Sequence, residues 1–259
     1  MIELTREGPL ARLTLRRAAK KNAMTTAMWR TLLESCEALA AERRRAEPAA
    51  TRVLLVAGEG GAFCAGADIE ELASLVRDPA ALAANNALVT QAQLALQGLP
   101  LPTLALIDGP CFGGGFGIAA ACDFRLATPG SLFAVTPARL GLLYSIEDTQ
   151  RVLALLGLAR ARRLLLCSER LDAATALAWG ALDAVVEAGD LQATGQRWAE
   201  QLAAQSPTSL TGIKATLALL TEHSAGAEAG VRTAYDAAFT GADFAEGAAA
   251  FLAGRPPRF

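Results

Sequence analysis

Two short apolar runs, each followed by a turn of small residues and then a helical segment, constrain the fold of this chain most. The runs are Val-Leu-Leu-Val at 53–56 and Thr-Leu-Ala-Leu-Ile at 103–107. Continuous apolar runs of this length are typical of strands that are buried on both faces of a parallel sheet. Because such strands alternate with helical segments in the first part of the chain, we expect an α/β core.

The remaining periodicity predicts a hairpin, further strands and a long helical region. We expect the hairpin strands at 2–5 and 11–15, and later strands at 123–127 and 182–186. We expect helices at 25–46, 69–77, 85–98, 116–122, 146–167, 172–179, 190–205, 207–222, 226–239 and 243–253. The sequence therefore predicts a β/α core in residues 1–190 and a helical C-terminal region in residues 191–259.

The composition excludes several classes of function. Lys and Arg number 24 against 26 Asp and Glu, and this balance does not favour nucleic-acid binding. The single histidine, His223, argues against a multi-histidine metal site, and we expect it at a surface helix end. No apolar run approaches the length of a membrane span, and the first ten residues do not resemble a signal peptide. The five cysteines show no CxxC pairing, so we expect reduced thiols in a cytoplasmic protein without a metal.

The two turns, residues 64–68 and 112–116, share one design. Each carries small residues into the start of a helix, where the first amide groups lack intrahelical acceptors and a ligand can come close. Two such amides aimed at one oxygen would form an oxyanion hole for a thioester enolate. Either turn alone is more typical of an ordinary strand-to-helix connection. The spacing Gly115-x-Gly117-x-x-Ala120 also fits a dinucleotide pattern, but the strand ends too early and the required acidic residue is absent.

Taken together, these segments resemble the enoyl-CoA hydratase/isomerase family, the crotonase superfamily. The matching stretches follow one another along essentially the whole chain, at 21–24, 60–69, 109–117, 121–124, 133–141, 179–183 and 246–251. The resemblance implies a crotonase-like spiral β/α core followed by C-terminal helices that form trimers, often paired into hexamers. It also implies an acyl-CoA thioester as the ligand, with coenzyme A as part of the substrate and no tightly bound cofactor.

The resemblance also assigns site residues by position. The backbone N–H groups of Ala67 and Gly114 would be the two oxyanion donors. The residues that would line the coenzyme and substrate path are Lys21, Ala23, Ala65, Gly66, Asp68, Ile69, Gly113, Pro137 and Ser145. The basic cluster at 16–21 could contact a phosphate of the coenzyme or could be a solvated turn.

The two glutamates of the resembled hydratases are missing from this chain. Their positions are Gly117 and Pro137, and the position of the acidic residue of simple isomerases is Ser145. Hydration of an enoyl thioester needs a base for water and an acid for the α-carbon, and neither glycine nor proline can carry a proton. The usual hydratase chemistry therefore cannot come from these positions.

Two other residues remain as catalytic candidates, Tyr144 and Glu147. The stretch 133–144 resembles methylmalonyl-CoA decarboxylase including its tyrosine, although that enzyme has a histidine at the position of Ala67. Tyr144 could hold a substrate carboxylate, shuttle a proton if its pKa is lowered, or simply pack on a neighbouring helix. Glu147 lies in the first turn of the expected helix at 146–167, and Ser145-x-x-Asp148 predicts a cap there, so we expect Asp148 to be structural.

These residues leave three functions open. The first is an acyl-CoA-processing lyase or isomerase that stabilises a thioester enolate in a backbone oxyanion hole. The second is a decarboxylase of the methylmalonyl-CoA type, because loss of carbon dioxide generates the enolate directly and needs no strong base. The third is a catalytically silent acyl-CoA-binding protein that keeps the cradle without the chemistry.

Overall fold

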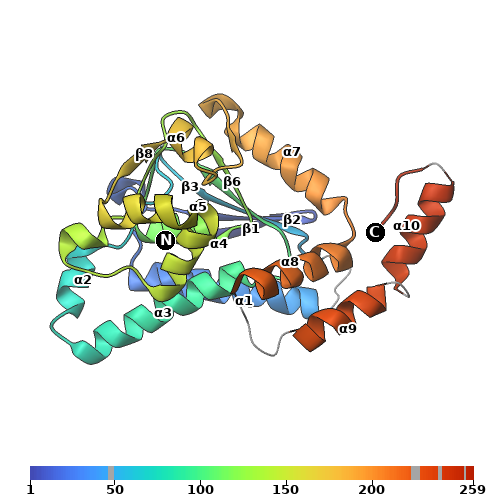
Figure 1. Ribbon diagram of the computed structural model, residues 1–259, viewed down its shortest axis with the longest axis horizontal. Coiled ribbons are helices and arrows are strands. Elements are labelled where there is room, and N and C mark those ends of the chain that lie inside the picture. The colour runs from blue at the N-terminus through green and yellow to red at the C-terminus, as the bar shows by residue number, and fades with distance from the viewer. Residues whose placement is uncertain (46–49, 223–227, 239–240, 254) are drawn as a thin grey trace.

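The computed structural model describes residues 1–45, 50–222, 228–238, 241–253 and 255–259 (Figure 1). The expected position of His223, and the ends of the helices predicted near residues 46, 226 and 239, lie outside the described residues.

A six-stranded sheet forms the centre of the fold. Its strands are β1 (Ile2–Glu7), β2 (Leu10–Leu15), β3 (Val53–Gly58), β4 (Thr103–Ile107), β6 (Phe124–Ala127) and β9 (Ala184–Val185), in that spatial order. The β1–β2 hairpin is antiparallel and every other neighbouring pair is parallel. The predicted hairpin, the two apolar strands and the later strands are therefore all confirmed.

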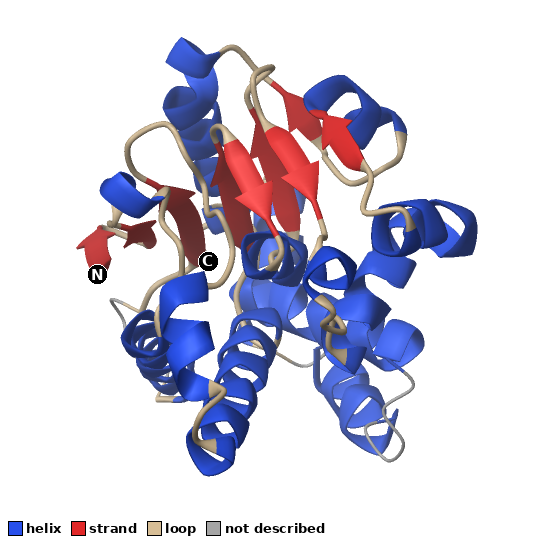
Figure 2. Ribbon diagram, turned by 90° about the vertical axis from the view of Figure 1, so that its left-hand side faces the viewer, coloured by secondary structure: helices blue, strands red, loops and turns tan. Residues whose placement is uncertain are grey.

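Helices cover both faces of this sheet (Figure 2). On one face, α7 (Leu191–Ala203) packs on Val53 and Leu55 of β3. On the other face, Leu54 and Val56 belong to the core that includes α1 (Thr26–Arg44), α3 (Pro79–Gln97) and α4 (Gly114–Ala121). Because side chains alternate across a strand and both faces are covered, residues 53–57 of β3 are all apolar.

A second, three-stranded sheet was not predicted. It consists of β5 (Pro110–Phe112), β7 (Leu132–Ala134) and β8 (Arg170–Asp172). Strands of three residues are too short to show a period in the sequence. Gly109, with a φ of 69°, turns the chain from β4 into β5. The chain therefore leaves the six-stranded sheet and enters the three-stranded sheet at this residue.

Two helices begin earlier than predicted. The helix expected at 85–98 begins at Pro79, because Asp78 caps it by accepting hydrogen bonds from the amides of Ala80 and Ala81. The helix expected at 116–122 begins at Gly114, inside the glycine triplet. Glycine is a poor helix former, but here the close approach of Cys64, whose carbonyl oxygen would lie inside the contact distance of a Cβ atom at Gly115, favours it.

Three further helices complete the core, and three helices follow α7 in the C-terminal region. The first group is α2 (Ile69–Leu75), α5 (Ile146–Leu166, interrupted at Gly157) and α6 (Ala173–Ala178). The second is α8 (Pro207–Glu222), α9 (Glu228–Ala238) and α10 (Ala242–Leu252), with α10 lying far from the sheet in Figure 1. Lys214 of α8 is held to the core by its ammonium, 2.7 Å from Asp123 Oδ2. Among the described helices, none combines the length and apolar character that crossing a membrane requires.

Candidate active site

The two small-residue turns lie against each other. Cys64 N donates to the Pro110 carbonyl, and Phe112 N donates to the Cys64 carbonyl, both at 2.9 Å. Gly66 has a φ of +100°, and a Cβ atom there would lie 2.9 Å from the Phe112 carbonyl and 3.5 Å from Gly114 N. Only glycine allows this backbone conformation together with this approach, so the sequence of the turn fixes how closely the two loops meet.

The amides of Ala67 and Gly114 are neighbours, and both are available to a ligand. A Cβ atom at Gly114 would lie 4.0 Å from Ala67 N and 3.2 Å from Cζ2 of the buried Trp29. Gly114 is the first residue of α4, so its N–H has no intrahelical acceptor. Within the described part of the chain, Ala67 N also donates to no protein acceptor. Ala67 is exposed and Gly114 is half-buried, so the two predicted donors lie at an accessible surface above Trp29.

The segment 21–24 is fastened along the first turn by backbone hydrogen bonds. Ala65 N donates to the Lys21 carbonyl at 2.9 Å, Met24 N donates to Gly66 at 2.7 Å, and Asp68 N donates to Met24 at 2.9 Å. The structure therefore brings Lys21 beside the Ala67 turn, as predicted, although the two lie more than forty positions apart.

Asn22 organises this contact, and the sequence analysis did not single it out. Its side chain is fully buried, and its Nδ2 donates to the carbonyls of Glu59 and Ala62 at 2.9 and 2.7 Å. Its Oδ1 accepts from Arg17 N at 2.8 Å. The backbone of Asn22 has a φ of 57°, a conformation that asparagine tolerates better than most residues. The signal that could have revealed its role is its place within the family stretch 21–24.

Most of the basic cluster at 16–21 is already paired. The ion pairs are Arg16 with Glu3 and Glu59, Arg17 with Asp68, and Lys20 with Glu70. Lys21 is exposed, and its ammonium has no ion-pair partner among the residues that the structure describes. Of this cluster, Lys21 is therefore the cation best placed for a phosphate.

Asp68 caps α2. Its Oδ1 accepts from Glu71 N at 2.9 Å. This bond, together with the Arg17 guanidinium, lowers the pKa of the Asp68 carboxyl below its ordinary value. The reciprocal half of the capping box is absent, because the Glu71 carboxylate accepts from Thr26 N at 2.8 Å instead. Ile69, the next residue after the cap, is about half exposed, at 52%.

Tyr144 reaches the second turn directly. Its hydroxyl donates to the Gly113 carbonyl at 2.9 Å, and its ring packs on the main core. Burial raises the pKa of Tyr144 well above its ordinary value, and the nearby Asp148 carboxylate raises it further. The lowered pKa that proton shuttling would need is therefore absent, because the phenol lies in an apolar surrounding beside a negative charge.

The other predicted residues of this region lie around the start of α5. Ser145 Oγ accepts from Asp148 N at 3.0 Å, which confirms the predicted cap. Glu147 is half-buried in the first turn and makes no hydrogen bond or ion pair with the described residues. Pro137 is half-buried and begins a short 3₁₀ turn, Pro137–Leu140.

A buried polar cluster that the sequence analysis treated as structural lies against Gly117. Asp148 and Arg151 are each 5% exposed, and Arg151 Nη1 lies 2.9 Å from Asp148 Oδ1. Arg151 Nε donates to Gln97 Oε1, and the neighbouring Gln93 is also buried. Desolvation raises the pKa of Asp148, and the charge of Arg151 opposes that rise. The three-residue spacing of Asp148 and Arg151 on one helix was the available signal.

The cysteine in the first turn is not a nucleophile. Cys64 is fully buried, and this burial raises the pKa of its thiol to about 12. Its sulfur accepts from Gly66 N at 3.4 Å, so it supports the turn. Among the described residues, no group of three or more His, Cys, Asp or Glu side chains could hold a metal ion.

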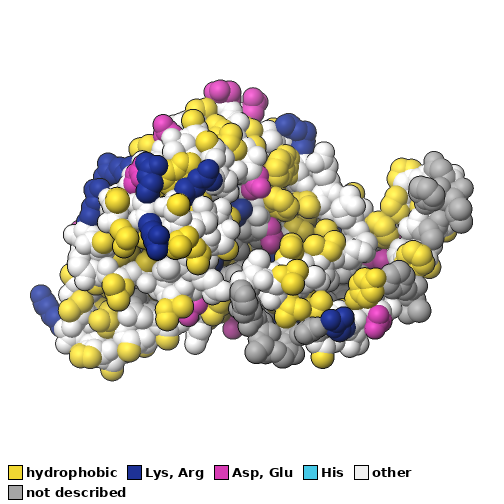
Figure 3. All heavy atoms as spheres, viewed as in Figure 1, with side chains coloured by type: hydrophobic (Ala, Val, Ile, Leu, Met, Phe, Trp, Pro, Cys, Tyr) yellow, Lys and Arg dark blue, Asp and Glu magenta, His cyan; other side chains and the backbone are white. Residues whose placement is uncertain are grey.

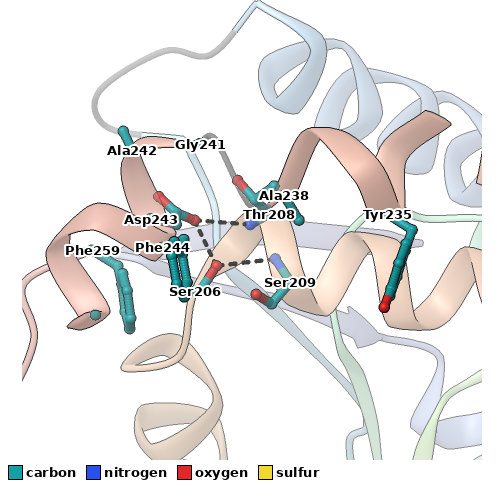
Figure 4. A pocket seen from close by; sticks show the side chains of 11 residues that line it. Ser206, Thr208, Ser209, Tyr235, Ala238, Gly241, Ala242, Asp243, Phe244 and Phe259 are labelled. Carbon is teal, nitrogen blue, oxygen red and sulfur yellow. Dashed lines mark hydrogen bonds between the residues drawn. The ribbon is translucent and has the colours of Figure 1, made fainter. Parts of the chain in front are cut away.

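A separate pocket of about 690 Å³ lies among α8, α9 and α10 (Figure 4). Ser206 Oγ and Thr208 N both donate to Asp243 Oδ2 there, so Asp243 joins α10 to the start of α8. Its apolar lining includes Tyr235 and Phe244. None of its lining residues belongs to the two turns, so this pocket is distinct from the candidate active site.

Comparison with known proteins gives a consistent result over the whole chain. The sequence model described as enoyl-CoA hydratase/isomerase matches residues 5–259. A Mycobacterium tuberculosis protein named "Probable enoyl-CoA hydratase echA6" is 29% identical over 261 residues, which cover 100% of this chain and 99% of that protein. The mitochondrial methylglutaconyl-CoA hydratase of Rattus norvegicus is 28% identical over 253 residues, covering 95% and 78% of the two chains.

Solved structures agree with these sequence relatives. An enoyl-CoA hydratase/carnithine racemase from Magnetospirillum magneticum superposes with a TM-score of 0.91 at 33% identity, over 100% of this chain and 94% of that one. An enoyl-CoA hydratase from Bacillus anthracis gives a TM-score of 0.89 at 27% identity, over 100% and 98%.

Proposed function

Because the chain belongs to the enoyl-CoA hydratase/isomerase family, we propose that it binds an acyl-CoA thioester and stabilises its enolate with the amides of Ala67 and Gly114. Its relatives are hydratases and isomerases, so the chain is an enzyme of the lyase or isomerase type that acts on a coenzyme A thioester. The observation that carries the proposal is the pair of neighbouring amides at the junction of the two turns, neither of which donates to an acceptor in the described part of the chain.

The proposed hole acts on the thioester carbonyl oxygen. As negative charge develops on this oxygen, the two N–H groups donate to it from positions fixed by the Gly66 approach and by the start of α4. Fixed donors need no reorganisation during the reaction, and removal of one such donor costs about 10²–10³ in rate. Tyr144 positions the second donor in this proposal, because its hydroxyl holds the carbonyl of Gly113, the residue before Gly114.

The coenzyme would follow the first turn. The residues proposed to line this path are Lys21, Ala23, Ala65, Gly66, Asp68 and Ile69, with Gly113, Pro137 and Ser145 nearer the acyl group. The Lys21 ammonium has no ion-pair partner among the described residues, which supports a phosphate contact, and the exposed Ile69 side chain supports an apolar contact. Coenzyme A enters as part of the substrate, and the proposal includes no tightly bound cofactor.

Decarboxylation is the second candidate. Gly117 and Pro137 supply no acid or base, and loss of carbon dioxide would form the enolate without one. The proton of the Tyr144 hydroxyl is already donated to Gly113, so a substrate carboxylate would have to displace that bond to receive it. The exchange experiment also distinguishes both enzymes from a protein that only binds acyl-CoA.

Assembly and location extend the proposal. We place the interface of a trimer, or of a dimer of trimers, on the helical region 191–259. Large apolar side chains are exposed on α8, α9 and α10, among them Leu217, Leu220, Tyr235 and Phe244 (Figure 3).

A cytoplasmic location is supported by five free cysteines, four of them buried.

The test is exchange of the acyl α-protons in heavy water, followed by mass spectrometry on acetyl-, butyryl- and octanoyl-CoA. Gly114→Pro removes the N–H, and proline is tolerated at the first position of a helix. Gly114→Ala is the matched control, because it keeps the N–H and places the same Cβ atom against Trp29. We expect Gly114→Pro to lower exchange about 10²–10³-fold relative to Gly114→Ala.

Equal exchange in the two folded variants would refute the role of Gly114. Binding of every thioester by the wild type without exchange, turnover or carbon dioxide release would leave only the silent protein. Release of carbon dioxide from a carboxylated thioester such as methylmalonyl-CoA would establish the decarboxylase instead.

A further inference from the structure

Asp148 places a carboxylate beside position 117, where this chain has glycine and the resembled hydratases have a glutamate. A Cβ atom at Gly117 would lie 2.5 Å from Asp148 Oδ1 and closer still to Gln93 Nε2. The volume that a side chain at position 117 would enter is therefore already filled by a carboxylate from α5 and a carboxamide from α3. Glycine at 117 is what makes room for them.

This place adjoins the proposed oxyanion hole. Gly117 follows Gly114 by three residues on α4, so the two lie on one side of the helix, one turn apart. Tyr144 connects the same residues from another direction. Its hydroxyl is bonded to Gly113, and its pKa is raised by the charge of Asp148, so the carboxylate and the loop face the same phenol.

The carboxylate is held firmly among buried polar groups. Arg151 Nη1 bonds to Asp148 Oδ1, and the side chains of Ser145 and Gln93 also hydrogen-bond to this carboxyl and lower its pKa. Arg151 Nη2 is sealed from solvent and has no hydrogen-bond partner among the described residues. A buried donor without an acceptor destabilises a fold. A cluster built only for stability would satisfy this donor, so the arrangement is typical of a functional site.

We propose that Asp148 is the acid–base residue of this enzyme and acts on the acyl group across Gly117; the inference rests on the proposed function. The Asp148 carboxylate removes the α-proton of the bound thioester. The electron pair of the Cα–H bond forms the carbon–carbon double bond of the enolate, and the thioester oxygen takes the negative charge beside Ala67 and Gly114. Return of a proton from the carboxyl group to the α-carbon restores the carboxylate.

The pH dependence of this step is set by the groups around the carboxylate. Arg151 faces it from α5, Tyr144 faces it from the preceding segment, and the neutral Gln93 and Gln97 lie on α3. Burial raises the pKa of Asp148 and so makes the carboxylate a stronger base, whereas the positive charge of Arg151 lowers the pKa. Exchange should therefore rise with pH as Asp148 ionises, and removal of Arg151 should move the midpoint to higher pH.

The experiment measures α-proton exchange with acetyl-, butyryl- and octanoyl-CoA, together with their affinities, in folded variants checked by circular dichroism. We expect Asp148→Asn to lower exchange about 10²–10⁴-fold while the thioester affinity stays near that of the wild type. Asp172→Asn is the matched control, since this exposed aspartate caps α6 and asparagine can also cap. Arg151→Gln should keep exchange but shift its pH midpoint upward.

Several results would overturn the assignment of Asp148. One is exchange at the wild-type rate in folded Asp148→Asn, and another is loss of exchange in Glu147→Gln but not in Asp148→Asn. If Asp148→Asn does not fold, an unmoved midpoint in Arg151→Gln is decisive against it. Impaired Gly114→Pro beside unaffected Asp148→Asn would leave the proposed function intact and reject only Asp148. A wild type that exchanges no thioester would reject both.

Discussion

Restoring a glutamate at position 117 should damage the protein rather than complete its active site. The Cβ atom of the new side chain would lie 2.5 Å from Asp148 Oδ1, well inside the contact distance of the two atoms. Overpacking of this kind costs about 1–3 kcal/mol. Replacing a helical glycine raises the free energy of unfolding by about 0.5–1 kcal/mol. A second buried carboxylate beside Asp148 lowers it again through repulsion between like charges.

The expected net loss in the free energy of unfolding of Gly117→Glu is about 2 kcal/mol. For a chain of this size that loss lowers the melting temperature by about 4–8 °C. Asp148→Ala alone should cost about 3–5 kcal/mol, because it leaves the Arg151 guanidinium buried without its partner. In the double variant, the new carboxylate can enter the vacated volume and face Arg151.

The assay is urea unfolding of the wild type, both single variants and the double variant, monitored by circular dichroism. We expect the double variant to be more stable than the sum of the single losses by about 1–3 kcal/mol. Additivity within about 0.5 kcal/mol would show that positions 117 and 148 do not share one volume, and the structural argument for Asp148 would fail.

Two further predictions concern the turns. Tyr144→Phe removes the hydrogen bond to the Gly113 carbonyl, so it should lower the free energy of unfolding by about 0.5–1.5 kcal/mol. It should also lower turnover more than acyl-CoA affinity. Steady-state kinetics equal to those of the wild type would show that Tyr144 serves only in packing. Asp68→Asn keeps a cap on α2 but loses the negative charge beside Arg17. Because the pKa of Asp68 is lowered in the folded protein, the ionised carboxylate stabilises the fold above its ordinary pKa. This stabilisation disappears as the pH falls through the lowered pKa. The difference in unfolding free energy between the two proteins should therefore be largest near pH 7 and shrink as the pH falls from the ordinary pKa through the lowered one. A difference that stays constant or grows as the pH falls would contradict the sign.

The parts of the fold predicted from sequence are those with a strong local signal. Val53–Gly58 and Thr103–Ile107 appear as buried strands because two covered sheet faces require unbroken apolar runs. The strands Pro110–Phe112 and Leu132–Ala134 have only three residues each, and long-range pairing defines them. Their presence could not be inferred from a local period.

The active site likewise has parts that the sequence predicted and parts that only the structure revealed. The stretches 21–24, 64–68 and 112–116 could be assembled from their resemblance to a family, and the structure places all three in contact. The environment of Asp148 could not be predicted, because it depends on Gly117 and Gln93 from two other helices. The direction of the pKa of Tyr144 likewise depends on burial, which the sequence does not reveal.

The central claim is that two main-chain amides polarise one thioester carbonyl, and vibrational spectroscopy of a bound ¹³C=O-labelled acyl-CoA tests it directly. Two hydrogen bonds weaken the carbonyl double bond, so the account predicts a lower stretching frequency on the wild type and on Gly114→Ala than on Gly114→Pro. An identical carbonyl frequency on all three proteins, with the ligand bound, would contradict it.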